Sequence, residues 1–385
     1  MEQKSREVLA REAAGILISW YREQGRHFPW RDEPSPYHVW ISEIMLQQTR
    51  TAAVMPYYDR FLAELPDVAA LAAVEDDRLM KLWEGLGYYS RARNLKRAAE
   101  EIMQKYGGAL PNRAETLEKL PGIGPYTAGA IASIAFGQPS PAVDGNVLRV
   151  MARLLADGRD VLDASVRRDM EALLAGCYPA AGEDCRNLTQ GLMELGEVVC
   201  VPAGKPGCEG CPVRELCRAR QENLVDKLPY RSPARPRRTV EKTVFLLFRG
   251  DRVAIAKRPS KGLLAGLWEF PNADGHLSEE KAREYLTERG FSPALLQETP
   301  RARHVFTHLE WHMTGFRVDC GDVGGDEETC PEKSAKDARS VSENEDREAI
   351  LGAGDAFSKI IWVTADELRR DYAIASAFRP FVDLL

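Results

Sequence analysis

One carboxylate lies in a segment that is otherwise apolar and rich in amides. The segment is HVWISEIMLQQTRTAAVMPYYDRF, residues 38–61, and the carboxylate is Glu43. Apolar residues recur there at roughly helical spacing, so we expect a helix with at least one buried face. Burial would disfavour the charged form of Glu43 and let it carry a proton at neutral pH. The simpler alternative is a surface glutamate near a helix start, where negative charge suits the helix dipole.

A second carboxylate, Asp144, precedes the apolar run of VDGNVLRVMARLL. This pattern is typical of a helix N-cap, whose side chain accepts hydrogen bonds from backbone N–H groups. We expect such bonds to keep Asp144 ionised. A protonated Glu43 and an ionised Asp144 would together supply an acid and an anion. For an isolated aspartate, capping alone explains the position.

Four of the eight cysteines lie within residues 200–217, as Cys200, Cys208, Cys211 and Cys217. In a compartment that keeps thiols reduced, such grouping favours a metal or cluster site over disulfides. Four thiolates that close a short loop suit a [4Fe–4S] cluster, and zinc is the alternative on chemistry alone. The other cysteines lack this grouping, and we expect free thiols at Cys177, Cys185, Cys320 and Cys330.

The segment LEKLPGIGPYTAGAIASIAF, residues 117–136, has the form of a hairpin between two helices. We expect Gly122 and Gly124 to supply positive φ and close backbone approach. Helix N-terminal amides that point outward from such a turn can hold a phosphate oxygen without a lysine. An ordinary helix–turn–helix connection is the alternative.

Length and charge limit the number of domains and the kinds of partner that these motifs can serve. The 385 residues, 44% of them hydrophobic, suffice for two or three domains. The N-terminus lacks a basic start followed by an apolar core, and no apolar run approaches membrane-spanning length, so we expect a cytoplasmic protein. The net charge is −6, but residues 321–350 carry ten acidic and four basic side chains. The remainder is near neutral, and charge therefore does not exclude a nucleic-acid partner.

The elements that must position these residues fall into two regions. Apolar periodicity predicts an almost entirely helical region, residues 1–225, with helices near 7–23, 39–62, 77–85, 91–105, 125–136, 146–156, 164–175 and 186–198. A basic linker, 226–238, follows. Residues 239–385 predict an α+β domain, with two β-rich runs around Gly250-Asp251, a helix near 279–289 and a mobile acidic insertion at about 321–350.

Several motifs resemble those of MutY-type adenine DNA glycosylases, in the helix-hairpin-helix superfamily. They are FPWR (28–31), SEIMLQQTRTAAVMPYY (42–58), LWEGLGYYSRARNL (82–95), the hairpin, PAVDGNVLRV (141–150), the cysteine group, GLWEFP and HVFTHLEWH. The resemblance covers nearly the whole chain. It implies a DNA-repair enzyme that removes adenine mispaired with 8-oxoguanine or guanine in double-stranded DNA, acting as a monomer on the bacterial nucleoid.

The same resemblance implies roles for the carboxylates. Glu43 protonates N7 of the flipped adenine, and Asp144 faces the oxocarbenium-like sugar, by electrostatics or through a transient covalent adduct. The resemblance also implies that Tyr126 lies near the sugar and that Asn146 orders Asp144. Tyr126 stands where related enzymes that also nick DNA carry a lysine, and a phenol cannot form their imine, so we expect a monofunctional glycosylase.

Flipping a base out of a duplex requires a wedge and a pocket. The resemblance gives Gln48 and Tyr88 the wedge and stacking roles. It lines the adenine pocket with Trp30, Arg31, Leu46 and Gln190. Core aromatic residues are the alternative for Tyr88 and Trp30.

The resemblance also implies a [4Fe–4S] cluster, but with six residues between the first two cysteines, where this chain has seven. We therefore expect a loop bulge, with Cys200 the least secure ligand. Lys205 and Arg214 of this loop would contact phosphates or remain solvated charges.

The C-terminal domain resembles a Nudix fold whose acidic, magnesium-binding helix is reduced to remnants in HLSEEKAREYLTERGF. We expect it to recognise 8-oxoguanine through Phe306, Thr307 and His308, with Thr307 replacing the family's serine. The rival interpretations are an endonuclease III-like bifunctional lyase, a non-catalytic damage-binding protein and a Nudix hydrolase. Tyr126 and the C-terminal domain argue against the lyase, Glu43 and Asp144 against the non-catalytic protein, and the degraded acidic helix against the Nudix hydrolase.

Overall fold

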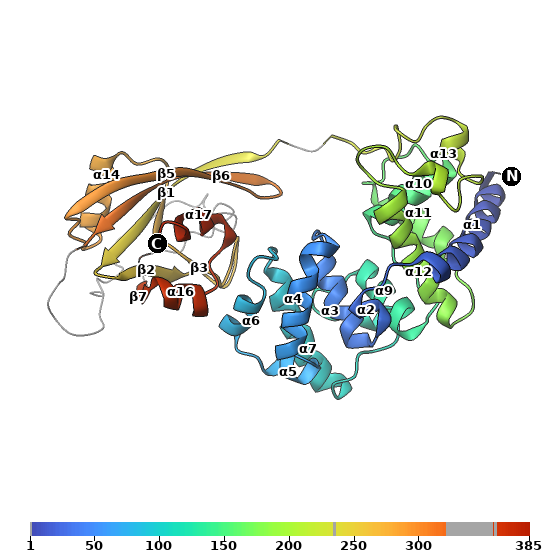
Figure 1. The fold of residues 1–385 in the computed structure, drawn as a ribbon, viewed down its shortest axis with the longest axis horizontal. Helices are drawn as coiled ribbons and strands as arrows, with labels where there is room; N and C mark the ends of the chain where they lie inside the picture. Colours follow the sequence, from blue (N-terminus) through green and yellow to red (C-terminus); the bar gives the residue numbers. More distant parts are fainter. Residues whose placement is uncertain (1, 234–235, 321–356, 358–359) are drawn as a thin grey trace, which may run out of the picture. The chain divides into compact units, whose positions relative to one another are not determined.

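The chain divides into two compact units in a computed structural model that describes residues 2–233, 236–320, 357 and 360–385. The first unit comprises Met1–Ala73 and Asn94–Ala234, and the second comprises Val74–Arg93 and Arg235–Leu385 (Figure 1). The division near residue 234 falls inside the predicted basic linker. Residues 74–93 group with the C-terminal unit, which the sequence does not suggest.

The described part of the first unit is built from helices and loops. The helices are α1 (Glu2–Gln24), α2 (Pro29–Asp32), α3 (Pro36–Leu46), α4 (Thr51–Glu64), α5 (Val68–Ala73), most of α7 (Ser90–Tyr106), α8 (Ala114–Leu117), α9 (Pro125–Phe136), α10 (Gly145–Leu155), α11 (Ala164–Ala175), α12 (Glu183–Glu194), the π-helix η1 (Leu195–Val199), the 3₁₀ turn η2 (Cys208–Gly210) and α13 (Arg218–Gln221). No helix in the described ranges is long and apolar enough to cross a membrane.

The predicted single helix over 39–62 is wrong, because the chain breaks it into α3 and α4. Gln48 takes a φ of 58°, a left-handed backbone that an α-helix does not contain. The spacing of apolar residues indicates which side of a segment is buried. It does not show whether the segment forms one helix or two. The break exposes Gln48 and makes it part of a cavity wall instead of a helix face.

Two groups of helices form the cores of the first unit. Helices α1, α10, α11 and α12 pack around a buried cluster that includes Leu17, Met151, Met170 and Leu188. Helices α2, α3, α4 and α9 form the second group, and α12 also contacts α9 (Figure 1). Gly129 allows α9 to approach the neighbouring chain closely, since a Cβ there would meet the carbonyl oxygen of Pro141 at 2.1 Å. These two groups hold the elements that carry the carboxylates.

The second unit contains a mixed sheet. Its strands are β1 (Arg238–Arg249), β2 (Arg252–Lys257), β3 (Trp268–Glu269), β4 (Asn272–Asp274), β5 (Leu295–Val305), β6 (Leu309–Asp319) and β7 (Ile360–Thr364). The order is β3-β2-β1-β6-β5, with β1 and β6 parallel, β4 beside β1 and β7 beside β2. The pairing of Phe248 with Val253 confirms the predicted hairpin around the Gly-Asp turn.

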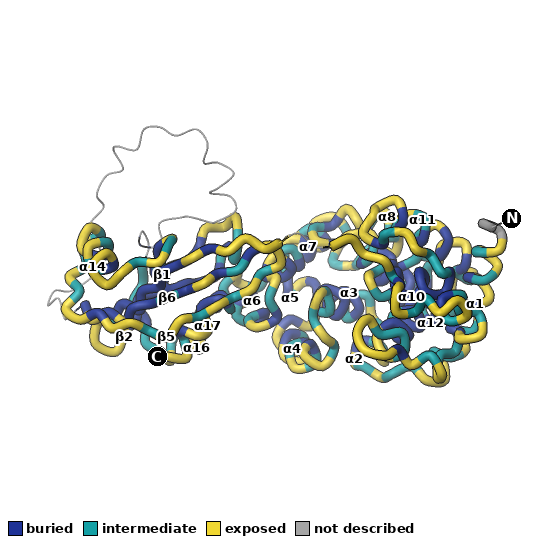
Figure 2. Tube along the Cα trace, turned by 90° about the horizontal axis from the view of Figure 1, so that it is seen from above, coloured by how far each residue is buried: buried dark blue, intermediate teal, exposed yellow. Residues whose placement is uncertain are grey.

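Helices complete the second unit: α6 (Asp76–Leu82), the start of α7, α14 (Glu279–Glu288), α16 (Ala365–Asp371), the 3₁₀ turn η3 (Ser376–Phe378) and α17 (Arg379–Val382). Strands β1, β2 and β6 are buried over much of their length (Figure 2), and Phe245, Leu247 and Phe316 pack with Leu286 of α14. The predicted α+β character is confirmed. The predicted acidic insertion at 321–350 lies outside the described residues.

Candidate active site

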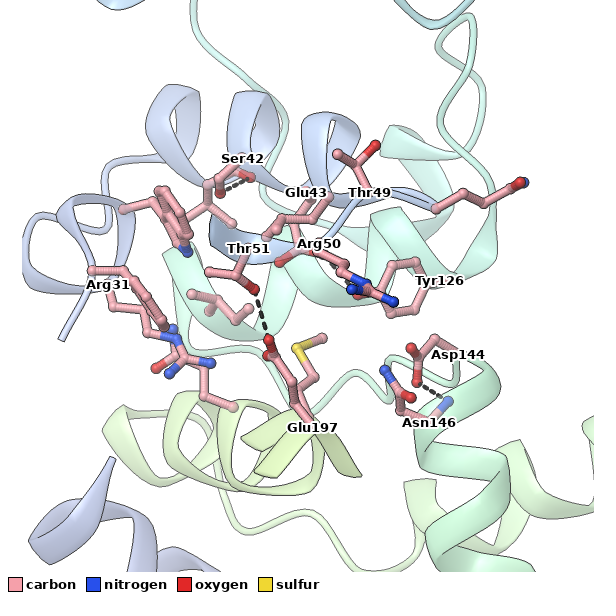
Figure 3. Close-up of a pocket in the computed structure, with 18 residues that line it drawn as sticks. Arg31, Ser42, Glu43, Thr49, Arg50, Thr51, Tyr126, Asp144, Asn146 and Glu197 are labelled. Atoms are coloured by element: carbon pink, nitrogen blue, oxygen red, sulfur yellow. Dashed lines mark hydrogen bonds between the residues drawn. The ribbon is translucent and has the colours of Figure 1, made fainter. Parts of the chain in front are cut away.

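A cavity of about 370 Å³ in the first unit gathers side chains from α2, α3, α9, α10 and α12 (Figure 3). Its volume lies in the range of small-molecule sites. The structure brings nine residues predicted from the sequence into its lining: Trp30, Arg31, Glu43, Leu46, Gln48, Tyr126, Asp144, Asn146 and Gln190.

Glu43 is fixed and protonatable in this cavity. It is 6% exposed on α3, and the hydroxyl of Tyr126 donates a hydrogen bond to its Oε2 at 2.8 Å. Burial raises the pKa of Glu43 to about 7, opposed by the Tyr126 hydrogen bond and reinforced by the negative charge of Asp144. Glu43 can therefore hold and release a proton near neutral pH.

Tyr126, from α9, is the donor in this contact. Burial and the neighbouring carboxyls of Glu43 and Asp144 raise the pKa of its phenol well above 10. The phenol therefore stays protonated across the physiological range, and it can keep donating to Glu43.

Asp144 caps the N-terminus of α10, as predicted. Its Oδ1 accepts from the backbone N–H groups of Asn146 at 2.9 Å and Val147 at 2.7 Å. Burial nevertheless raises its pKa from 3.8, against those bonds and the cations of Arg149 and Arg167. The prediction that capping fixes its ionisation is therefore incomplete, because burial is the larger effect. Asp144 still has more groups stabilising its anion than Glu43 has.

Asn146 is held by a residue that motif reasoning missed. Arg149 donates to the Asn146 side-chain carbonyl at 2.9 Å, and to the backbone carbonyls of Cys200 at 2.8 Å and Gly196 at 2.6 Å. The Asn146 amide nitrogen is thus left to donate elsewhere. Gly196 allows the π-helix η1 to lie against Asn146, because a Cβ at Gly196 would meet the Cβ of Asn146 at 2.8 Å. Arg149 and Gly196 lie in helical segments, and the sequence around them gives no sign of this contact.

Aromatic rings and an amide form one wall of the cavity. Trp30 is buried and stacks on Phe28 with ring centroids 5.1 Å apart. It therefore belongs to an aromatic core and lines the cavity as well. Gln190 accepts a hydrogen bond from the hydroxyl of Tyr21 at 2.8 Å, which fixes its side chain at the cavity.

A second pocket, of about 330 Å³, lies within the second unit. Tyr88, Phe306, Thr307 and His308 all line it, and the hydroxyl oxygens of Tyr88 and Thr307 are 3.2 Å apart in a hydrogen bond. Tyr88 is 47% exposed, so the alternative that it is a core aromatic is wrong. Its φ of 48° is left-handed, as is the φ of 56° at Leu264 in the same pocket.

The loop between β5 and β6 presents the last three of these residues. Phe306 donates its backbone N–H to the carbonyl of Leu309 at 2.8 Å, and its ring contacts His304 and Trp311. Phe306 thus anchors the loop, while Thr307 and His308 are exposed at its tip.

The hairpin before α9 needs one of its two glycines for conformation. Gly122 has a φ of 76°, and a Cβ there would meet the Cβ of Asn94 at 2.6 Å. Gly124 has a φ of −92° with nothing within 4 Å of an added Cβ, so the prediction of positive φ for Gly124 is wrong. Gly124 is the N-cap of α9, where extended backbone suits any residue.

The four grouped cysteines occupy one region of the first unit. Burial raises the pKa of Cys211 to about 11 and also raises that of Cys217, and the nearby thiols of Cys200 and Cys208 add to both shifts. Among the described residues, no three His, Cys, Asp or Glu side chains are arranged to hold a metal ion. A cluster of four irons takes one thiolate on each iron, so its ligands need not converge on one point. The donor set fits such a cluster.

The extra residue before Cys208 lies inside a closed loop. The backbone N–H of Cys200 donates to Leu195 at 2.7 Å, and that of Gly207 donates to Val199 at 2.9 Å. Gly204, with a φ of 77°, turns the chain between them. Arg153 donates to the Cys200 sulfur at 3.2 Å, so this thiol has a fixed neighbour.

The helical fold of the first unit belongs to a class of base excision repair proteins, as a family model shows. Residues 41–175 match the family model described as HhH-GPD superfamily base excision DNA repair protein, and residues 243–384 match that of the NUDIX domain. The chain belongs to the adenine DNA glycosylase family, which confirms the resemblance found in its motifs.

Two relatives illustrate this membership, and one solved structure is similar in part. The chain is 36% identical over 357 residues to the human adenine DNA glycosylase, covering 77% of this chain and 65% of the human protein. It is 36% identical over 353 residues to the mouse adenine DNA glycosylase, covering 76% and 68%. A non-covalent endonuclease III–DNA complex is 26% identical, with a TM-score of 0.47, covering 58% of this chain and 98% of that one. The chain thus spans about two thirds of the two mammalian relatives.

Proposed function

We propose that the chain is a monofunctional adenine DNA glycosylase, which hydrolyses the N-glycosidic bond of adenine mispaired with 8-oxoguanine or guanine in duplex DNA. The observation that carries this proposal is the pair of carboxyls in one cavity. Glu43 has a pKa of about 7, and Asp144 is held by backbone donors at the start of α10. An acid and an anion in one pocket suit the cleavage of a glycosidic bond.

The proposed reaction begins with a flipped nucleotide. Gln48, exposed at the cavity, fills the space that the adenine leaves in the duplex. The base enters the cavity lined by Trp30, Arg31, Leu46 and Gln190. Gln48 holds a strained left-handed backbone, which is typical of positions fixed for function.

Proton transfer and bond cleavage follow. Glu43 gives its proton to adenine N7, and the electrons of the C1′–N9 bond leave with the base. Asp144 stabilises the developing positive charge on the sugar or captures C1′ as a transient ester. Water then adds to C1′, and a proton returns to Glu43. Asn146 orders Asp144, and Tyr126 offers no amine for an imine, so cleavage of the DNA strand is not expected.

The opposite base is recognised in the second unit. The pocket that joins Tyr88 to the loop of Phe306, Thr307 and His308 presents a phenol, a hydroxyl and an imidazole. 8-Oxoguanine differs from guanine by its 8-oxo group and an N7 hydrogen, and polar groups of this kind can separate the two. The hairpin amides after Gly122 are proposed to hold a DNA phosphate.

The cysteine group is proposed to hold a [4Fe–4S] cluster through Cys200, Cys208, Cys211 and Cys217. When bound, the cluster would cross-link the loop that these residues form. Purified protein should be brown and contain iron and sulfide, and Cys211→Ser should lower the soluble yield. Stoichiometric zinc without iron or sulfide would overturn this assignment.

One experiment tests the proposed activity and its rivals together. The protein is incubated with a duplex that contains one A:8-oxoguanine pair, and the products are separated with and without alkaline treatment. We expect a strand break only after alkali, and free adenine in equal amount. Breaks without alkali would identify a lyase, and intact DNA with tight binding would identify a non-catalytic damage-binding protein. Light scattering of the same complex tests the proposed monomer.

A further inference from the structure

A buried carboxylate outside the catalytic pair lies behind the adenine-pocket wall. Glu194, the last residue of α12, is 1% exposed. Its Oε2 pairs with Arg31 Nη1 at 2.7 Å and accepts from Arg26 Nη2 at 3.1 Å, and its Oε1 pairs with Arg26 Nε. Two cations from the segment before and within α2 thus converge on one carboxylate, a set that motif reasoning missed.

Arg31 is the member of this group that reaches the cavity. Its side chain is 10% exposed, and its Nη1 also donates to the backbone carbonyl of Arg26 at 3.2 Å. Its guanidinium lies over the rings of Phe28 and Tyr21, at 4.9 and 5.6 Å from their centroids. The ion pair, the carbonyl and the two rings therefore fix one orientation of Arg31.

Stability alone does not account for a buried ion pair of this kind. Removing two charges from water is costly, and apolar residues of similar volume often stabilise a protein as well or better. The charges are therefore explained better by what Arg31 does at the cavity than by packing.

We propose that Glu194 is a positioning residue of the adenine pocket, which fixes the Arg31 guanidinium and balances its charge beside Glu43. This inference rests on the proposed function, because it assigns Glu43 the task of delivering a proton. Glu194 does not line the cavity, and it acts through Arg31.

The balance matters because Glu43 must keep its proton near neutral pH. The charged and titratable groups that act on it are Tyr126 of α9, Asp144 before α10 and Arg31 of α2. Arg31 lowers the pKa of Glu43, whereas the charge of Asp144 raises it. An Arg31 without Glu194 would lower that pKa further, and the acid would be lost at a lower pH.

Neighbouring groups complete the electrostatic setting of Arg31. Arg26 also pairs with Glu197 at 2.8 Å, and Glu197 in turn accepts from the Thr51 hydroxyl at 2.8 Å. Glu197 is partly exposed, so solvent screens its charge more than that of Glu194. Glu194 is therefore the main counter-charge to Arg31.

The test is the pH dependence of single-turnover adenine excision. In the wild type, the excision rate should fall with rising pH as Glu43 loses its proton, which gives the descending limb of the pH profile. We expect Glu194→Gln to move this limb to lower pH by about one unit, so that the rate at pH values above the limb is about tenfold lower than in the wild type. Glu194→Asp keeps the charge and should keep the limb. Glu183→Gln makes the same chemical change at an exposed position on the same helix and should leave the whole profile unchanged.

A loss of rate in Glu194→Gln that is equal at every pH, with an unmoved limb, would overturn the proposal and leave a structural role. If this variant does not fold, Arg31→Gln is compared with the double variant Arg31→Gln/Glu194→Gln. The single change removes one of the two cations paired with Glu194 and leaves Arg26, so the excess negative charge should move the limb to higher pH, and the double change should return it. Identical limbs in these two variants would also overturn the proposal.

A second readout separates this inference from the proposed function. The carboxyl of Glu43 is titrated by ¹³C NMR without DNA, with its signal assigned by comparison with Glu43→Gln. We expect the titration midpoint to fall in Glu194→Gln whether or not the protein excises adenine. Failure of the wild type to excise adenine would refute the proposed function alone, and an unmoved midpoint would refute the role of Glu194 alone.

Discussion

The cavity of the first unit and the pocket of the second differ in how they hold their side chains. In the cavity, Glu43 is buried and receives a hydrogen bond from Tyr126, and Asp144 receives two from the backbone. In the pocket, Tyr88, Thr307 and His308 are exposed. Burial raises the pKa of a carboxyl, whereas hydrogen bonding to the edge of a base requires side chains that are exposed to solvent. The difference therefore matches a division between chemistry and recognition.

The two sites share one feature of the backbone. Gln48 at the cavity and Tyr88 at the pocket both have positive φ, at 58° and 48°, although neither is glycine. Such conformations cost energy and persist where the surrounding structure imposes them. Each site thus includes an exposed side chain on a strained backbone, and the proposed insertion of Gln48 and stacking of Tyr88 start from these positions.

The largest expected effect comes from Glu43→Gln. An amide cannot deliver a proton, and positioned acid catalysis is typically worth about 10²–10⁴-fold. We expect single-turnover excision to fall by that factor while affinity for the A:8-oxoguanine duplex is kept. Near-normal excision by this variant would show that Glu43 is not the catalytic acid. The distinction between a catalytic cavity and a recognition pocket would then lose its support.

Asp144→Asn separates capping from catalysis. Asparagine caps a helix about as well as aspartate does, so the melting temperature should change little. The anion that faces the sugar is lost, and we expect excision to fall by about 10²–10³-fold, as when a preorganised electrostatic group is removed.

The matched control is Asp163→Asn, at the N-cap of α11, where Asp163 accepts from the backbone of Ser165 at 2.7 Å. It should leave excision unchanged. Asp144→Asn with full activity, or with a large loss of stability, would mean that capping is the main role of Asp144.

The pocket of the second unit is tested by replacing Thr307 and His308 together with alanine. We expect the preference for A:8-oxoguanine over A:G to shrink by about 1–3 kcal/mol, the worth of a good base-specific contact. Affinity and single-turnover rate are measured on both duplexes. His312→Ala, an exposed histidine of β6 outside this pocket, is the control. Unchanged discrimination in the double variant would remove the recognition role.

Tyr126→Phe should have the smallest effect. Its hydrogen bond lowers the pKa of Glu43, so removing it raises that pKa, and the protonated acid persists to higher pH. The bond stabilises the ionised carboxylate more than the neutral acid, and a difference of about 1.4 kcal/mol corresponds to a shift of about one pH unit. The descending limb of the excision rate measures it. A shift to lower pH would contradict the assigned contact.

Much of the fold follows from local sequence patterns. Periodicity predicts α9, α10 and α11 closely, and the Gly-Asp turn predicts the β1–β2 hairpin. Local patterns fail where tertiary contacts decide, as at Gln48, whose left-handed backbone splits one predicted helix in two. Gln48 is not glycine and has a positive φ, whereas Gly124 is glycine and has an extended backbone that any residue could adopt.

Site residues can be predicted from the sequence where the residue type itself suggests a reaction. They cannot be predicted where their role depends on a partner far away in the sequence. Glu43 and Asp144 stand out as carboxylates in apolar segments. Glu194 pairs with Arg26 across 168 residues, so no short motif contains the pair. The contact of Tyr88 with Thr307 spans 219 residues, and residues 74–93 belong to the same unit as the C-terminal part of the chain. Such contacts follow only from the folded chain.

The most direct test of the account is the pH profile of single-turnover excision by the wild type on A:8-oxoguanine and A:G duplexes. Glu43 lies in the first unit and the opposite base is proposed to be read in the second, so the two substrates should differ in rate. Both rates should nevertheless fall through the same midpoint near pH 7, where Glu43 loses its proton. A rate that stays constant to about pH 9, or a midpoint that moves with the opposite base, would contradict the account.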